Sequence, residues 1–156
     1  MTKINKILVS LAVIFLFNAC GVVTPHLGGL NPPVSNPFKE LANVQVVRCT
    51  GNRSAATVEF VFTVTAHSNL ITKGTFGSFP NSKFTARGTA YKPYRDAGTS
   101  VELVRYTPSE VVMTVNQVPD YLTQFDRIEL AWYFNPSHHS GTNPLLVFHN
   151  IPIVWQ

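Results

Sequence analysis

Few side chains in this chain of 156 residues have the types and spacing that chemistry needs. His138 and His139 are adjacent in a loop rich in Gly, Ser and Pro, and adjacent side chains do not easily face one metal ion. The sequence contains no CxxC, HExxH or Asp-rich calcium loop, and no GxSxG marks a nucleophile. We therefore expect a solvated loop at His138 and His139, no resident metal and no cofactor.

The carboxylates and the thiol at position 49 indicate no catalytic group. Asp120 and Asp126 flank a loop that fixes no distance between them, so a glycosidase pair is not indicated. Cys49 lies beside Val46 and Val47, where a small buried hydrophobe is the expected role. The sequence thus favours a protein that is not an enzyme. A small enzyme with an unrecognised site is an alternative.

Tyrosines suggest a different chemistry, the stacking of an aromatic ring on a sugar. Tyr91 and Tyr94 flank a Lys-Pro pair, and three more tyrosines stand where partial exposure is expected: Tyr106, Tyr121 and Tyr133. A carbohydrate-binding accessory protein is therefore a second alternative. The main hypothesis is a non-catalytic binding or assembly module with an unknown protein or glycan ligand.

Cys20 has the clearest chemical context in the chain. Residues 1–6 are short and basic, and the apolar run at 7–17 is too short for a bilayer, which needs about 20 residues. A run of this length is typical of a secretory signal peptide. Phe17, Ala19 and Cys20 resemble the lipobox of bacterial lipoproteins, with Phe17 in place of the usual Leu.

The lipobox resemblance implies cleavage between Ala19 and Cys20 and a diacylglyceryl thioether on Cys20. The membrane is then a partner, because two or three acyl chains at about 0.8 kcal/mol per buried CH₂ give a stable anchor. No acidic residue lies between Cys20 and Glu40, so neither an inner-membrane retention signal nor a surface-export signal is indicated. We expect the protein to be anchored in the cell envelope, in the outer membrane most of all, with its domain facing the periplasm. A plain signal peptide that ends in Cys is the alternative.

Charge argues against a nucleic-acid partner. The formal net charge is +4, and removing Lys3 and Lys6 with the signal leaves ten basic residues against eight acidic ones, or +2. These cations are single and spread along the chain, whereas nucleic-acid binding needs a concentrated patch.

Composition and periodicity predict an all-β domain. Only 13% of residues are charged and 45% are hydrophobic, with eleven Pro and nine Gly, which indicates many turns and few helices. Apolar residues alternate with polar ones from about residue 44 onward. We predict an antiparallel β-sandwich with strands at 44–49, 57–65, 70–76, 82–91, 100–106, 111–118, 128–134 and 145–155.

The phase of the alternation names the expected core. It contains Phe60, Phe62, Trp132, Phe134, Phe148, Ile151, Ile153 and Trp155. Because the last strand changes phase between Phe148 and Ile151, a β-bulge is expected near Asn150.

Three regions are predicted in the chain. They are a signal peptide at 1–19, a lipidated Cys with a Pro/Gly-rich tether at 20–38, and a sandwich domain at 39–156. Asn36 is a candidate N-cap for one helical turn at 37–42.

The order of motifs resembles a family. Val118-Pro119 before the penultimate strand, the ending Phe148–Trp155, and a hairpin with Gly88 and Tyr91 are similar to small Bacteroidetes lipoproteins of unassigned function. The resemblance implies a single immunoglobulin-like β-sandwich of about seven or eight strands and implies no activity.

Replacing Cys20 tests the anchor. Cys20→Ser removes the thiol that accepts the diacylglyceryl group, so the protein should carry no lipid and keep an unprocessed mass. Mass spectrometry measures both, and cell fractionation shows where the variant lies. A variant that stays in membranes at the wild-type processed mass would contradict the lipoprotein hypothesis.

Overall fold

A computed structural model describes residues 32–77, 81–94, 98–135 and 145–156 and shows strands without helices in these segments. The strands are β1 (Val34–Ser35), β2 (Ala42–Asn52), β3 (Thr57–Ala66), β4 (Lys73–Phe76), β5 (Lys83–Ala86), β6 (Thr89–Tyr91), β7 (Thr99–Glu102), β8 (Pro108–Asn116), β9 (Gln124–Asn135), β10 (Leu145–Pro152) and β11 (Val154–Trp155). None of the described segments contains a helix long and apolar enough to span a membrane.

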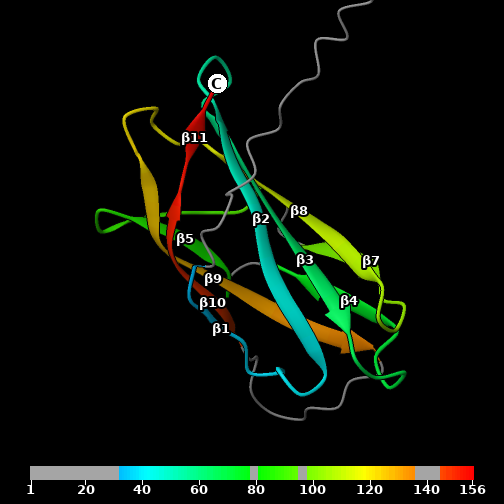
Figure 1. The fold of residues 1–156 in the computed structure, drawn as a ribbon. Helices are drawn as coiled ribbons and strands as arrows, with labels where there is room; N and C mark the ends of the chain where they lie inside the picture. The colour runs from blue at the N-terminus through cyan, green and yellow to red at the C-terminus, as the bar shows by residue number, and fades with distance from the viewer. Residues whose placement is uncertain (1–31, 78–80, 95–97, 136–144) are drawn as a thin grey trace, which may run out of the picture.

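The strands form two sheets that pack as a sandwich (Figure 1). One sheet has the order β11-β2-β3-β8, and the other has the order β1-β10-β9-β4-β7. An immunoglobulin-like sandwich places its strands A, B and E in one sheet and C, F and G in the other. Here β2, β3 and β8 take the first set of places, and β4, β9 and β10 take the second. The predicted all-β, immunoglobulin-like fold is confirmed.

One long strand position beside β9 is occupied by two short strands. β4 pairs with the later half of β9 and β5 with its earlier half. Between them, the Gly77 N–H donates to the Ala131 carbonyl at 2.9 Å, and the Ser82 hydroxyl accepts from the Ala131 N–H at 2.8 Å. Both polar groups of this β9 residue are thereby satisfied where the neighbouring strand is interrupted.

The predicted strand at 82–91 is wrong as a single strand, because it is a hairpin of β5 and β6. Arg87 and Gly88 have φ angles of 48° and 79°, the positive values that a two-residue type I′ turn requires. This turn matches the right-handed twist of the strands and reverses the chain at once. The hairpin implied by the family resemblance at Gly88 and Tyr91 is present.

Aromatic residues fill the space between the sheets. Phe60 and Phe62 of β3 contact Phe148 of β10, with ring centroids 5.1 and 5.5 Å apart. Near β4, Trp132 packs against Phe76 at 5.0 Å. The predicted core residues are buried except at the end: Phe60, Phe62, Trp132, Phe134, Phe148, Ile151 and Ile153 are less than 9% exposed, and Trp155 is half-buried.

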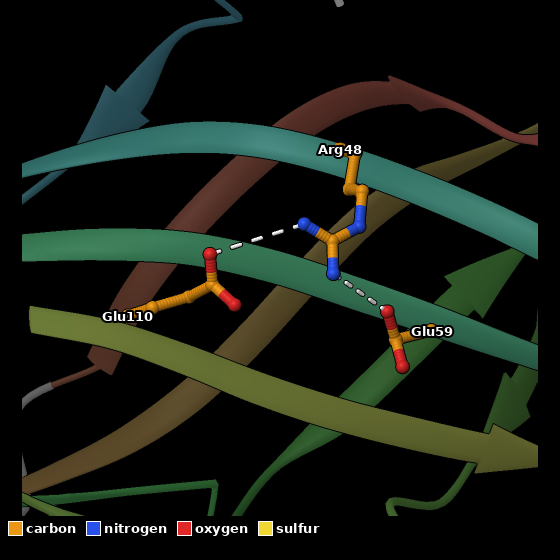
Figure 2. A network of polar contacts seen from close by, with 3 residues as sticks. All are labelled: Arg48, Glu59 and Glu110. Carbon is orange, nitrogen blue, oxygen red and sulfur yellow. Dashed lines mark hydrogen bonds and ion pairs between the residues drawn. The ribbon is translucent and has the colours of Figure 1, made fainter. Parts of the chain in front are cut away.

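Arg48 of β2 links the three strands β2, β3 and β8 on the outer face of their sheet (Figure 2). Its guanidinium lies 3.0 Å from Glu59 of β3 and 3.9 Å from Glu110 of β8. Val61 stands between them on β3, paired with Arg48 on one side, and is fully buried although it faces outward. The aliphatic part of a long cation covers apolar surface in this way while its charge stays in water.

The C-terminal segment belongs to both sheets. β10 pairs with β9, whereas β11 pairs in parallel with β2 of the opposite sheet. One continuous strand at 145–155 was predicted, and this is wrong because the chain changes sheets at Ile153. Trp155 then lies over Gly51, and its indole N–H donates to the Leu122 carbonyl.

The bulge predicted near Asn150 is also wrong, although the phase does change there. Asn150 has a φ of 53°, yet β10 and β9 keep one register from Leu145 to Pro152. Phe125 and Ile128 of β9 are both buried, so β9 changes phase opposite the same point. A register shift typical of a β-bulge lies instead in β2, between Val46 and Arg48.

The domain begins before the predicted boundary at residue 39. β1 pairs with β10, and Phe38 is 6% exposed with its ring 4.6 Å from that of Phe134. The Asn36 side chain accepts from the Phe38 N–H at 2.8 Å, as an N-cap does, but 37–41 form a turn rather than a helix. Residues 34–38 are therefore part of the sandwich and not of a tether. The predicted signal and the tether as far as residue 31 lie outside the described residues.

Gly51 tests the contact that joins the C-terminal segment to β2. A Cβ at position 51 would overlap the Trp155 ring, so Gly51→Ala should lower the free energy of unfolding by about 1–3 kcal/mol and expose Trp155. Chemical denaturation and the wavelength of tryptophan fluorescence measure the two effects.

Gly88→Ala is the matched control for Gly51→Ala. Nothing lies within 4 Å of its added Cβ, so only the left-handed backbone opposes it, at about 1–2 kcal/mol. Its fluorescence should match wild type. An unchanged fluorescence and stability in Gly51→Ala would contradict the described position of Trp155.

Candidate functional site

A hollow lies where β6 leaves one sheet and approaches the end of β8 in the other. We call it the tyrosine groove. Its volume is about 620 Å³, and it is lined by Thr89, Ala90, Tyr91, Lys92, Pro93, Tyr94, Asn116 and Gln117. This is within the range of small-ligand sites, about 300–1,000 Å³. Hydroxyl, amide and aromatic groups predominate in the lining.

Tyr94 is held in place by its backbone rather than by its side chain. Pro93 is buried and forms a β-bridge with Val115, and the Tyr94 N–H donates to the Thr114 carbonyl at 2.8 Å. The Tyr94 side chain is nevertheless 66% exposed. A backbone held against β8 by these two contacts therefore presents a solvent-facing aromatic ring.

A second hollow shares Pro93 and Tyr94 with the tyrosine groove. Its volume is about 290 Å³, and its other lining residues are Thr99, Val112, Met113 and Thr114. Tyr94 thus stands between two adjoining hollows along β8.

Tyr121 lies close to the Tyr91 side of the groove. Burial raises the pKa of Tyr91, and the neighbouring Tyr121 raises it further. The Arg87 guanidinium lies 5.8 Å from the centre of the Tyr121 ring, in cation–π range. Tyr121 is 64% exposed, so this corner adds a second accessible ring.

The β5–β6 turn beside Tyr121 is fixed by Asp126. Its carboxylate accepts from the Gln124 side chain at 3.1 Å and from the Arg87 N–H at 2.7 Å. These two bonds, in that order, hold the pKa of Asp126 below its ordinary value, with a smaller contribution from the Arg87 charge. Asp126 is therefore a structural anion in the described structure.

The other residues considered for chemistry do not converge. Asp120 pairs with Arg53 at 3.5 Å, and Tyr106 stacks on Arg105 at 4.4 Å. Cys49 is 1% exposed, and burial raises the pKa of its thiol, which suits a packed hydrophobe. His138 and His139 lie outside the described residues. Within those residues, no three His, Cys, Asp or Glu side chains are placed to hold a metal ion.

The charged cluster around Glu129, like that around Arg48, was not predicted from the sequence. Glu129 of β9 lies 3.0 Å from Lys83 of β5 and 3.0 Å from Arg127. Burial raises the pKa of Glu129, but the hydrogen bonds and charges of Lys83 and Arg127 outweigh it, so the net pKa is lowered. The sequence signal for this cluster was that Arg127 and Glu129, two residues apart, lie on one face of a strand. Lys83 reaches Glu129 only because β5 pairs with β9, which the sequence does not reveal.

Comparisons with known proteins add little to this site. No family model matches the chain, and no curated protein matches it. Among solved structures, the CARDB domain of a Pyrococcus furiosus protein, solved in complex with di-metal ions, is similar at a TM-score of 0.35 and 10% identity. The match covers 80% of this chain and 90% of that one. The fold assignment rests on the strand order of this chain itself.

Glu129 makes the stability of the fold depend on pH. Because the pKa of Glu129 is lowered in the folded state, its ion pairs stabilise the fold fully at pH values above the ordinary carboxyl pKa of about 4.3. This stabilisation is lost as the pH falls through the lowered pKa, where Glu129 becomes protonated. Thermal unfolding midpoints of wild type and Glu129→Gln should differ most at pH 7, where wild type is higher. The two should converge toward pH 3, and a constant gap across this range would contradict the assignment.

Proposed function

We propose that this chain is a lipid-anchored lipoprotein of a bacterial cell envelope, and that its sandwich is a non-catalytic module that binds a ligand in the tyrosine groove. The observation that carries the binding role is the exposed Tyr94 ring, whose backbone is held against β8 and which stands beside a groove. Tyrosine is enriched at binding interfaces because its ring is apolar while its hydroxyl can bond to water or to a ligand.

The anchor rests on the sequence before the described residues. The lipobox at Cys20 supplies it, and residues 21–31 then link the lipid to a domain that begins near β1. We propose the outer membrane facing the periplasm, and we include in the proposal the likeness to small Bacteroidetes lipoproteins.

The non-catalytic role is supported by what lines the groove. Among the described residues, its lining contains no carboxylate, histidine or cysteine, so the side chains that most often act as general bases do not line it. Asp126, Asp120 and Glu129 are each held by a structural cation or amide. These charges stabilise the fold, and the groove offers hydroxyl, amide and aromatic groups that suit binding.

Photo-crosslinking in cells tests the binding role. A benzophenone amino acid at position 94 should insert into a molecule that occupies the groove, and it should give an adduct of higher mass. Position 106 is the matched control, because Tyr106 is 63% exposed but lies near the opposite end of β8, where its N–H donates to Ala66.

Adducts at position 94 and none at position 106 would support the proposal. The absence of an adduct at position 94, or the same adducts at both positions, would contradict it. Lipid attachment is measured separately through Cys20→Ser, so failure of the anchor and failure of the binding role are distinguishable.

A further inference from the structure

We infer, on the basis of the proposed function, that the tyrosine groove binds a saccharide chain with Tyr94 as its stacking platform. A pyranose ring has an apolar face of C–H groups and an equatorial rim of hydroxyls. It therefore needs a flat aromatic ring beside groups that both donate and accept hydrogen bonds. The groove places these two kinds of group next to each other.

The aromatic part of such a site is Tyr94. Its ring is exposed while its N–H is bonded to Thr114, so ligand binding costs little backbone ordering. Hollows of about 620 and 290 Å³ lie on its two sides, which suits a chain of sugar units passing over the ring rather than one enclosed small molecule.

The polar part comes from the end of β8 and the start of β6. Asn116, Gln117 and Thr89 line the groove and are exposed. Their side chains form no hydrogen bond with another described residue, so their donors and acceptors face the groove's solvent. An amide offers one acceptor and two donors, which matches neighbouring hydroxyls of a sugar. The Gln117 backbone is left-handed, with a φ of 57°, and turns the chain at the groove's border.

Other ligand classes fit this groove less well. A peptide that adds as a strand needs a free sheet edge, but the edge of β8 at Thr114 and Val115 is already occupied by Pro93 and Tyr94. A nucleic acid needs several cations, and Lys92 is the one cation in the lining among the described residues. A lipid chain needs an apolar lining, which the amides and hydroxyls interrupt.

Calorimetric titration of the protein purified in detergent tests this inference. The probes are the hexasaccharides of β-1,4-glucose, β-1,4-xylose, β-1,4-mannose and β-1,4-N-acetylglucosamine, together with soluble peptidoglycan glycan strands. At least one should bind with a Kd below about 1 mM, a weak affinity for a protein site.

Variants at position 94 separate stacking from general damage. Tyr94→Ala should weaken binding of that probe about tenfold, and Tyr94→Phe should restore most of the affinity because it keeps the ring. Tyr106→Ala is the exposed control and should bind within about twofold of wild type.

Two results would overturn the saccharide inference. One is no binding of any probe, and the other is equal affinity of wild type and Tyr94→Ala. If position 94 crosslinks to a protein while no probe binds, the inference fails and the proposed binding module stands. If no crosslink forms and no probe binds, both fail.

Discussion

The contact of two β3 phenylalanines with the opposite sheet sets the arrangement of the whole sandwich. Phe60 reaches Phe84 and Phe148, and Phe62 reaches Phe76 and Phe148. One strand thereby contacts three strands of the other layer, β4, β5 and β10. Large rings of this kind bury much apolar area and pack edge to face, which restricts how the layers can slide. The sheet edges, where the candidate site lies, are positioned by this layer of rings.

The candidate site is a consequence of how one sheet edge is closed. An open edge of β8 would expose unpaired backbone groups and invite aggregation. The chain between β6 and β7 prevents this near Val115, where Pro93 and Tyr94 pair with the edge. Farther along β8, Thr99 of β7 donates its hydroxyl to the Val112 carbonyl. The backbone of Tyr94 bonds to the edge of β8, and its ring points away from the core. The groove lies beside this ring.

Charge on the two outer faces follows one principle. Arg48 reaches Glu59 and Glu110, and Glu129 accepts from both Lys83 and Arg127, so each cluster joins residues on more than one strand. Exposed single pairs contribute at most about 1 kcal/mol, whereas shared and partly buried groups gain from lower dielectric and from covering apolar side chains.

Local alternation in the sequence was sufficient to predict the all-β class, most strands and the buried faces of β3 and β9. Period-two burial is a property of each strand alone, so it is visible without knowledge of its partners. The resemblance of residues 17–20 to a lipobox also comes from the sequence alone, and the anchor that it implies stays a prediction. What alternation could not predict was the partner of each strand. The split of 82–91 at Arg87 and Gly88 is a local turn of positive φ angles, which alternation does not reveal. The crossing of the C-terminal segment at Ile153 and the matched phase change at Asn150 depend on pairing between distant residues. The groove depends on the same kind of pairing. Tyr94 bonds to Thr114 only because the two sheets are already packed. The sequence does not show which tyrosines are exposed, since exposure depends on how distant segments pack.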